Sequence, residues 1–250
     1  MSIWQDCQAE RHKRAIQAQV LRIVESQEQV ATMSLVDTSS EQIVLENLLE
    51  ANKPALPEQT QAYHYLIKTP FRYPPLRYGS RFGNTSEPGI FYASLHLNTA
   101  LAECAYYRLV FLSAMKTGLT KHLVTEHTTF KVSVTTAHGL ALEKKPFKHF
   151  TNLISDPVNY ASSQQLGSDM RHAGIDVFTY QSARDPQQGI NAGIYKISAI
   201  KSKKPYGFQE WLCSTAATQV AFINKVDKNT RCNFKLDEFL VDGKFPQPAT

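Results

Sequence analysis

The stretch that decides the fold is Gly89-Ile90-Phe91-Tyr92-Ala93-Ser94, with a long helical pattern over residues 97–115 behind it. The first segment is short, apolar and rich in aromatic residues, and it predicts a strand buried on both faces. The second carries apolar residues on both of its sides, which indicates a helix without a solvated face. Upstream, residues 79–83 place Arg81 between two glycines, so the backbone there bends freely and can approach a ligand closely. We therefore expect a loop, a strand and a helix at the centre of the molecule.

The helix contains one acidic residue, Glu103, between Leu95 and Met115. Its helical neighbours at three and four residues are Thr99, Ala100, Tyr106 and Tyr107. An unpaired charge in such surroundings is costly or becomes protonated, so this carboxylate must be paired, hydrogen-bonded or neutral. Two interpretations have equal weight: Glu103 is a working residue, or it forms a structural ion pair with Arg81 or Arg108.

Length and composition favour one large domain or one domain with an N-terminal extension. The chain has 250 residues, of which 42% are apolar and 10% aromatic, and these values exclude disorder of the whole chain. Residues 1–18 are polar at first and free of Gly and Pro, so we expect a helical extension or arm there. Residues 19–250 form the predicted main domain, with a core over about 22–198 and further strands within 205–250.

Charge and cysteine usage bound the class of protein. The formal charge of +5 is scattered, which weakly favours an anionic ligand and does not indicate direct nucleic-acid binding. The four cysteines and eight histidines have no metal-ligand spacing, so no metal site is predicted. The N-terminus does not resemble a signal peptide and no segment predicts a membrane span, so we expect a cytoplasmic protein with reduced thiols.

Before the central stretch, the sequence predicts three elements. Residues 19–25 form an apolar strand with Arg22 as its lone cation, for which a surface position at a sheet edge is the simpler explanation. Ser39 or Ser40 caps a helix over residues 41–52. Three prolines make residues 69–78 a rigid extended connector that leads to the glycine loop.

Behind the central helix, strand patterns dominate. We expect strands at residues 122–134, 140–142, 175–180 and 193–198 and from Tyr206 through Ile223, with a helix over 158–173 that ends at Gly174. Strands and helices alternate irregularly, so an α+β fold with a mixed sheet and flanking helices is favoured over a doubly wound parallel sheet. Neither Gly-x-Gly-x-x-Gly nor Gly-x-x-x-x-Gly-Lys occurs.

The candidate site residues suggest nucleotide chemistry. An arginine fork such as Arg81 suits a phosphate, and Tyr92 offers an aromatic face to a flat ring. A fixed carboxylate at Glu103 can stabilise the oxocarbenium-like state through which an N-glycosidic bond is cleaved. Each residue also has a plainer interpretation: Ser182 as a turn hydroxyl, Tyr92 as a core residue, and Arg184 as the partner of Asp185 in a local ion pair.

Five segments in order resemble the RES domain, a family named for its arginine, glutamate and serine. They are Gly79-Ser80-Arg81-Phe82, Gly89 to Ser94, Thr99-Ala100-Leu101-Ala102-Glu103, Tyr160 to Gly167, and Gly174-Ile175-Asp176 through Ser182-Ala183-Arg184-Asp185-Pro186. Leu21-Arg22-Ile23-Val24 also resembles the arginine-bearing opening strand of that family, so the resemblance covers roughly Arg22 to Ser198 and extends into the C-terminal tail. It implies an ADP-ribosyltransferase-like fold and an enzyme that consumes NAD as substrate, without a resident cofactor. Such proteins cleave the nicotinamide–ribose bond by phosphorolysis or hydrolysis, or transfer ADP-ribose to a protein.

The resemblance also implies partners and residue roles. Many members are toxins of two-gene modules, covered by an Xre-type antitoxin, and inorganic phosphate is a possible second substrate. By position, Arg81 and Arg22 would hold phosphates or ribose, and Tyr92 would border the nicotinamide. Glu103 would stabilise the ribosyl cation and Ser182 would position the ribose or nicotinamide side. Arg184 is the remaining substrate-binding candidate.

The chain departs from the family pattern at two places, and two alternatives stay open. Tyr106-Tyr107-Arg108 stands where Tyr-His-Arg is expected, and Gln188-Gly189-Ile190-Asn191 stands where relatives often carry Gly-Gly-x-Cys. The second departure puts the packing near Ser182 in doubt. One alternative is a RES-like module that binds a nucleotide or protein without turnover. The other is an exported effector that modifies a host protein.

Overall fold

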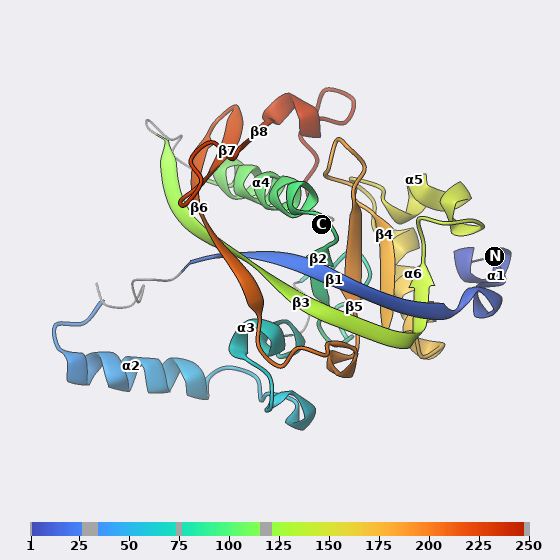
Figure 1. Ribbon diagram of the computed structural model, residues 1–250, viewed down its shortest axis with the longest axis horizontal. Helices are drawn as coiled ribbons and strands as arrows, with labels where there is room; N and C mark the ends of the chain where they lie inside the picture. The colour runs from blue at the N-terminus through green and yellow to red at the C-terminus, as the bar shows by residue number, and fades with distance from the viewer. Residues whose placement is uncertain (1, 27–34, 74–76, 116–121, 248–250) are drawn as a thin grey trace.

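The computed structural model describes residues 2–26, 35–73, 77–115 and 122–247. These residues contain an eight-stranded sheet in the order β1-β2-β5-β4-β3-β6-β7-β8 (Figure 1). The pairing of β3 with β4 is parallel and the other pairings are antiparallel. The expected α+β class, with a mixed sheet and flanking helices, is confirmed.

The elements have the following bounds. The strands are β1 (Arg14–Glu25), β2 (Phe91–Ser94), β3 (Leu123–Ala141), β4 (Val177–Gln181), β5 (Ile190–Ile194), β6 (Tyr206–Ala216), β7 (Gln219–Asn224) and β8 (Arg231–Lys235). The α-helices are α1 (Ile3–Asp6), α2 (Ser39–Ala51), α3 (Tyr65–Lys68), α4 (Leu97–Ser113), α5 (Thr151–Ile154) and α6 (Ala161–His172). Short 3-10 turns include Ala9–His12, Thr69–Phe71 and Ile197–Ala199.

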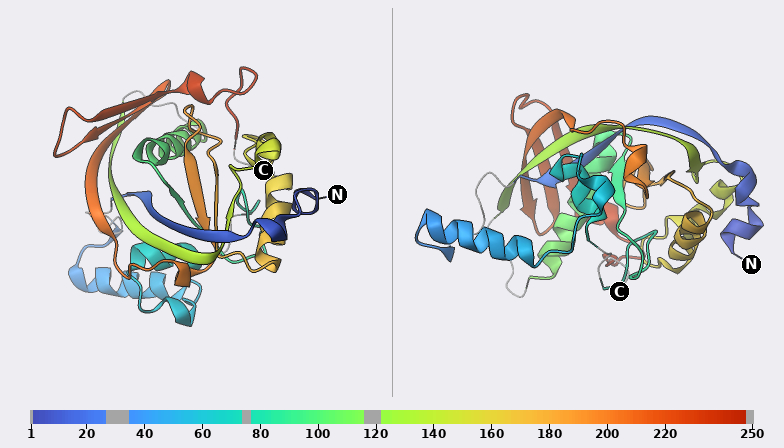
Figure 2. Two further views of the ribbon diagram at one scale, coloured as in Figure 1. Left: turned by 45° about the vertical axis from the view of Figure 1, so that its right-hand side comes forward. Right: turned by 90° about the horizontal axis from the view of Figure 1, so that it is seen from below.

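The long strand β3 organises the sheet. It pairs with β1 along one edge and with β6 along the other, and its last residues pair with β4. The pairing of β3 with β4 begins at Gly139, which lies opposite both Arg14 of β1 and Val177 of β4. A Cβ at Gly139 would come within 2.5 Å of the Ile16 side chain, so glycine lets the strands approach here without displacing that side chain. The extra β1–β3 pairing closes β1, β2, β5, β4 and β3 into a ring, whose curvature is visible in Figure 2.

Three groups of buried side chains fix the helices to the sheet. The first joins α1 and α6 to β4, with Phe178 fully buried. The second packs α3, through Ile67, against Phe130 of β3 and Ile194 of β5. The third packs α4, through Leu101, against Trp211 and its neighbours on β6, β7 and β8 (Figure 1). Helix α4 is therefore held by β2 at its start and by the β6–β8 strands along its length.

Several predicted boundaries were wrong. β1 begins at Arg14, before the predicted start at residue 19, so only the first part of the N-terminal extension is helical. The two predicted strands at 122–134 and 140–142 form one strand, β3. The strand predicted at 193–198 instead spans Ile190–Ile194 and is followed by a 3-10 turn.

Helix ends also differ from the predictions. Thr38, rather than Ser39 or Ser40, caps α2 by accepting the Glu41 N–H. α6 begins only at Ala161, because the Asp156 carboxylate accepts the N–H groups of residues 158 and 159 and holds them in a turn. The connector over 69–78 starts with a 3-10 turn, and Pro74 and Pro75 lie outside the described residues.

α4 does have a solvent-facing side, contrary to the sequence prediction. Tyr107 is 54% exposed and Phe111 is 53% exposed. The residue types misled the prediction because both are large aromatics, which usually favour the core. Among the described residues, no helix is long and apolar enough to cross a membrane.

Candidate functional site

The ends of β2, β4 and β5 meet beside α4. Asn191 of β5 lies opposite Ser94 of β2 and Tyr180 of β4. The β4–β5 turn is closed by a hydrogen bond from the Ser182 N–H to the Gly189 carbonyl at 2.7 Å. The Leu95 N–H, just before α4, donates to the carbonyl of Ile190. This topology brings the second turn of α4 against the β4–β5 turn, which is far away in the sequence.

The Glu103 carboxylate is held by two neutral donors. Ser182 Oγ donates to Glu103 Oε1 at 2.7 Å, and Asn191 Nδ2 donates to the same oxygen at 2.6 Å. The proposed structural ion pairs are not what holds Glu103: Arg108 pairs with Glu25 at 3.0 Å, and Arg81 donates to backbone carbonyls. Glu103 is partly exposed.

Ser182 makes the turn contacts considered from the sequence and also contacts Glu103. Its side-chain oxygen accepts the N–H groups of Arg184 at 3.1 Å and Asp185 at 2.9 Å while its proton points to Glu103. The turn is tied to α4 by Thr99, whose hydroxyl donates to Asp185 Oδ2 at 2.8 Å. A Cβ on Gly189 would come within 2.0 Å of Thr99 Oγ1, so glycine permits this contact. The hydrogen-bonding capacity of Ser182 is therefore filled despite the departure from the family pattern.

Asn191 is the site residue that sequence reasoning missed. It is 2% exposed, and its Oδ1 accepts the Ser94 hydroxyl proton at 2.6 Å. The available signal was a lone amide within the apolar stretch Ile190–Ile194, since a buried polar side chain in a strand must find partners. Its partners became clear only from the strand register.

Arg81 and Arg184 converge on the segment before α6 and not on the carboxylate. Arg81 Nη1 donates to the Asp156 carbonyl at 2.6 Å, and its guanidinium lies 4.3 Å from the Tyr160 ring centre. Arg184 Nη2 donates to the Pro157 carbonyl at 2.6 Å and to the Tyr160 hydroxyl at 3.2 Å. The described ion pairs include none between Arg184 and Asp185, so the local pair considered from the sequence is not formed.

Arg22 and Tyr92 lie together on β1 and β2. Arg22 Nη1 donates to the Tyr92 carbonyl at 3.1 Å, and its guanidinium lies 5.0 Å from the Phe91 ring centre. Burial lowers the pKa of Arg22 to about 10, which still leaves it charged at neutral pH. Arg22 is thus half-buried and not a surface cation at the sheet edge.

The Tyr92 hydroxyl holds the glycine loop. It accepts the Phe82 N–H at 3.0 Å and shares a hydrogen bond of 2.9 Å with the Ser80 hydroxyl. Burial raises the pKa of Tyr92 to about 12, so the hydroxyl is neutral at physiological pH. Tyr92 also packs against the buried group of α1, α6 and β4, so the core interpretation of this residue is partly correct.

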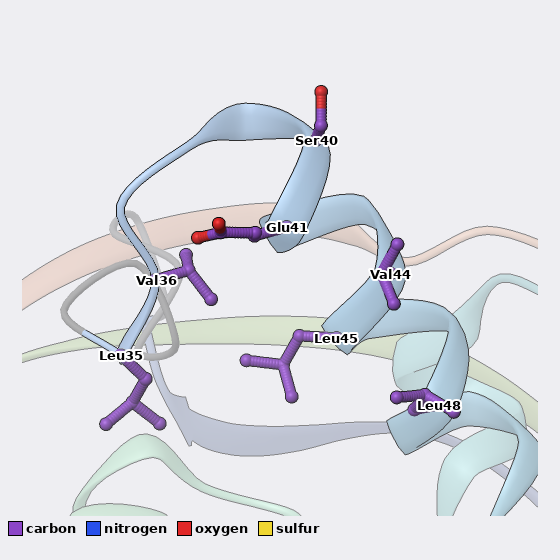
Figure 3. Close-up of a pocket in the computed structure, with 7 residues that line it drawn as sticks. All are labelled: Leu35, Val36, Ser40, Glu41, Val44, Leu45 and Leu48. Carbon is purple, nitrogen blue, oxygen red and sulfur yellow. The ribbon is translucent and has the colours of Figure 1, made fainter.

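Two cavities differ in character. A polar cavity of about 360 Å³ is lined by the Ser182 turn and by residues near α5, including Asn152 and Ser155. An apolar cavity of about 450 Å³ is formed by α2 and the residues just before it (Figure 3). The second contains none of the candidate site residues, whereas the first shares Ser182 with the candidate site.

Comparison with protein families now identifies the chain. The model of the RES domain matches residues 56–213, which is more than half of the sequence. The chain belongs to the RES domain family. The RES match includes Arg81, Glu103, Ser182 and Asn191, while Arg22 lies before it.

Similarity beyond the family model is distant. One solved structure, the MbcT–MbcA toxin–antitoxin complex of M. tuberculosis, contains a chain 9% identical to this one. The match covers 85% of this chain and 91% of that chain, with a TM-score of 0.48. The comparison with curated proteins found no match.

Proposed function

We propose that this RES domain protein is an NAD-degrading enzyme that cleaves the nicotinamide–ribose N-glycosidic bond. Membership of the RES family supports this proposal, together with the arrangement of the site. The observation that carries it is the Glu103 carboxylate, which is anchored by Ser182 and Asn191 with no cation neutralising it among the described ion pairs. A fixed, unneutralised anion is the group that a developing ribosyl cation requires.

The chemistry assigned to Glu103 is electrostatic. When the bond between ribose C1′ and the nicotinamide nitrogen breaks, its electron pair leaves with nicotinamide and C1′ takes on oxocarbenium character. The Glu103 carboxylate stabilises that positive charge. The cation is then captured at C1′ by an oxygen of inorganic phosphate or of water, and water loses a proton in the process. Arg22, Arg81 and Arg184 supply positive charge for the substrate phosphates.

The hydrogen bonds of the three arginines leave N–H donors for the substrate phosphates. The guanidinium groups of Arg81 and Arg184 each donate hydrogen bonds to backbone carbonyls between Ile154 and Pro157. A guanidinium has five N–H donors, so both retain donors for a phosphate oxygen. Arg22 makes one described hydrogen bond, to the Tyr92 carbonyl, and likewise retains donors.

We further propose that the enzyme is the toxin of a two-gene module with an Xre-type antitoxin as its protein partner. This step rests on the RES family, because toxins of such modules are frequent in it. A helix-turn-helix protein encoded next to this chain and able to restore the growth of cells that express it would support the step. Growth that is unaffected by this chain alone would contradict it.

The decisive experiment is incubation of the purified protein with NAD, with and without inorganic phosphate, followed by chromatography of the products. Nicotinamide release that requires phosphate identifies a phosphorylase, and release without phosphate identifies a hydrolase. Glu103→Gln keeps the size of the side chain and removes its charge. By analogy with the loss of one preorganised electrostatic group, we expect turnover to fall by roughly 100- to 1,000-fold.

Two outcomes would redirect the proposal. Unchanged turnover in a folded Glu103→Gln protein would overturn the role of Glu103. Intact NAD under both conditions would leave a protein acceptor to be tested, with ADP-ribose transfer as the activity. If no acceptor supports turnover, the interpretation as a binding module becomes the better one.

A further inference from the structure

The two donors at Glu103 bind the same oxygen atom. Ser182 Oγ and Asn191 Nδ2 donate to Oε1, at 2.7 and 2.6 Å, and no hydrogen bond to Oε2 is found among the described residues. A carboxylate oxygen offers two lone-pair directions, so these donors saturate Oε1. The two oxygens of Glu103 are therefore not equivalent. Oε1 accepts two hydrogen bonds from the protein, and Oε2 accepts none from the described residues.

The orientation of the Asn191 amide is fixed by its neighbours. Oδ1 accepts the Ser94 hydroxyl proton at 2.6 Å, and Asn191 is 2% exposed between β2 and β4. A deprotonated carboxylate only accepts hydrogen bonds, so Nδ2 and not Oδ1 must face Glu103. The Ser94 hydroxyl then donates to Oδ1, the acceptor atom of the amide. The chain Ser94–Asn191–Glu103 thus has a single consistent direction of donation.

Ser182 has no capacity left for a substrate. Its single hydroxyl proton goes to Glu103, and its oxygen accepts from the N–H groups of Arg184 and Asp185. One donor and two acceptor positions complete the capacity of a hydroxyl. In this arrangement Ser182 acts on the reaction through Glu103 and does not contact the ribose.

We propose that Asn191 is a positioning residue for Glu103, and that it and Ser182 together hold Oε1 so that Oε2 faces the reacting sugar. The inference rests on the proposed NAD-cleaving function and assigns parts to that same site. Two donors on one oxygen fix the plane of the carboxylate before substrate binds, so no reorientation is needed when positive charge develops. Asn191 is a better anchor than a cation, because an amide leaves the full negative charge on the carboxylate.

The most direct test is Asn191→Asp, which changes shape little and replaces the donor with an acceptor. Two carboxylates at hydrogen-bond distance cannot both ionise easily, so the pair retains a shared proton and its upper pKa rises. We expect a reduced kcat at neutral pH, because the shared proton leaves one negative charge spread over both carboxylates, and no recovery as the pH is raised, because the doubly ionised pair has no donor to hold Oε1. Asn191→Ala removes the anchor without adding a charge, and we expect about a tenfold loss in kcat with no shift of the pH profile.

A second readout needs no NAD. In Asn191→Asp the pKa of the pair is higher in the folded state than in the unfolded state. Between these two pKa values the unfolded state binds fewer protons than the folded state. Stability relative to wild type is therefore highest at low pH and is lost as the pH increases from about 5 to 8. Thermal unfolding across this range measures the effect. Asn233→Asp on the exposed strand β8 is the matched control, and we expect no such trend for it.

Kinetics separate positioning from substrate contact. If Ser182 acts through Glu103, Ser182→Ala lowers kcat and leaves KM near the wild-type value. A raised KM with unchanged kcat would mean that Ser182 binds substrate, and it would overturn this assignment. A wild-type pH profile together with a pH-independent stability difference in Asn191→Asp would overturn the role of Asn191. Absence of NAD turnover in the wild type would overturn the proposed function, and the unfolding series would still report whether Asn191 faces Glu103.

Discussion

Helices α4 and α2 both carry a large apolar surface, but the molecule uses them differently. α4 spans 17 residues and buries eight of them, including Leu101 and Tyr106. α2 spans 13 residues and buries none, and Ile43, Val44 and Leu48 are between 57% and 63% exposed. The comparison teaches that an apolar pattern predicts a helix but does not determine what the helix packs against.

The attachments of the two helices explain the contrast. α4 continues from a buried strand, packs on β6, β7 and β8, and is tied to the β4–β5 turn through Thr99. α2 is tied at its C-terminal end, where Glu50 pairs with Arg72 at 2.6 Å and with Lys53 at 2.9 Å. In Figures 1 and 2, α2 lies at the periphery of the molecule. A site that needs a carboxylate held firmly is therefore built on α4.

The largest expected effect on this comparison comes from Leu101→Ala in α4. Leu101 is fully buried in the group that joins α4 to the β6–β8 strands. Its truncation leaves a cavity, and we expect a loss of about 2–5 kcal/mol in the free energy of unfolding. Chemical denaturation with a fluorescence readout measures this change. A loss below about 1 kcal/mol would mean that α4 is not the firmly packed element that the comparison requires.

The central part of the fold could be predicted because its signals are local. The aromatic run at Phe91–Ser94, the helix that follows it and the glycine at position 174 each follow from neighbouring residues. The placement of Arg14 to Ala18 in a strand could not be predicted, because their polar pattern gains strand structure only from the partner β3.

The candidate site could be predicted only in part for the same reason. Arg81, Glu103 and Ser182 were selected from their surroundings and the family resemblance, but the contact between Glu103 and Ser182 joins residues 79 positions apart. Asn191 has no local signal beyond its polarity. Its role depends on the register that places it opposite Ser94 and near α4, which is a property of the folded sheet.

The next effect in size concerns the contact between α4 and the site turn. In Gly189→Ala the added Cβ would lie within 2.0 Å of Thr99 Oγ1 and 2.5 Å of Asp185 Oδ2. The turn must shift away from α4, and we expect a loss of about 1–3 kcal/mol in stability. NAD turnover should fall as well, because the shift moves Ser182 away from Glu103. The control is Ala183→Gly, which adds flexibility to the β4–β5 turn without displacing it. Gly174→Ala is a poor control, because Gly174 has a positive φ.

A smaller effect is expected from pH on the sheet beneath α4. His127 of β3 is 2% exposed, and burial, aided by the charge of Arg108, holds its pKa below the ordinary value near 6.5. The unfolded chain therefore binds a proton more readily, so the stabilisation is present above about pH 6.5 and is lost as the pH falls below it. Thermal unfolding between about pH 7.5 and about pH 5.5, which is about one unit on either side of the reference pKa, should show a steeper decline in stability for wild type than for His127→Gln. Parallel declines would show that other groups control the acid limb.

The smallest expected effect is from Leu48→Ala in α2, the chemical counterpart of Leu101→Ala. Leu48 lines the apolar cavity of α2 (Figure 3) but remains 57% exposed, so its truncation removes little buried surface. We expect a change within about 0.5 kcal/mol in the free energy of unfolding, the range for surface substitutions. NAD turnover should be unchanged, because the α2 cavity shares no residue with the candidate site. Leu48→Ala could instead lower the free energy of unfolding as much as Leu101→Ala does at a high protein concentration, but not at a low one. That result would mean that α2 is covered by another molecule in solution. The two helices would then differ in their partners: α4 would pack within the molecule and α2 against another molecule.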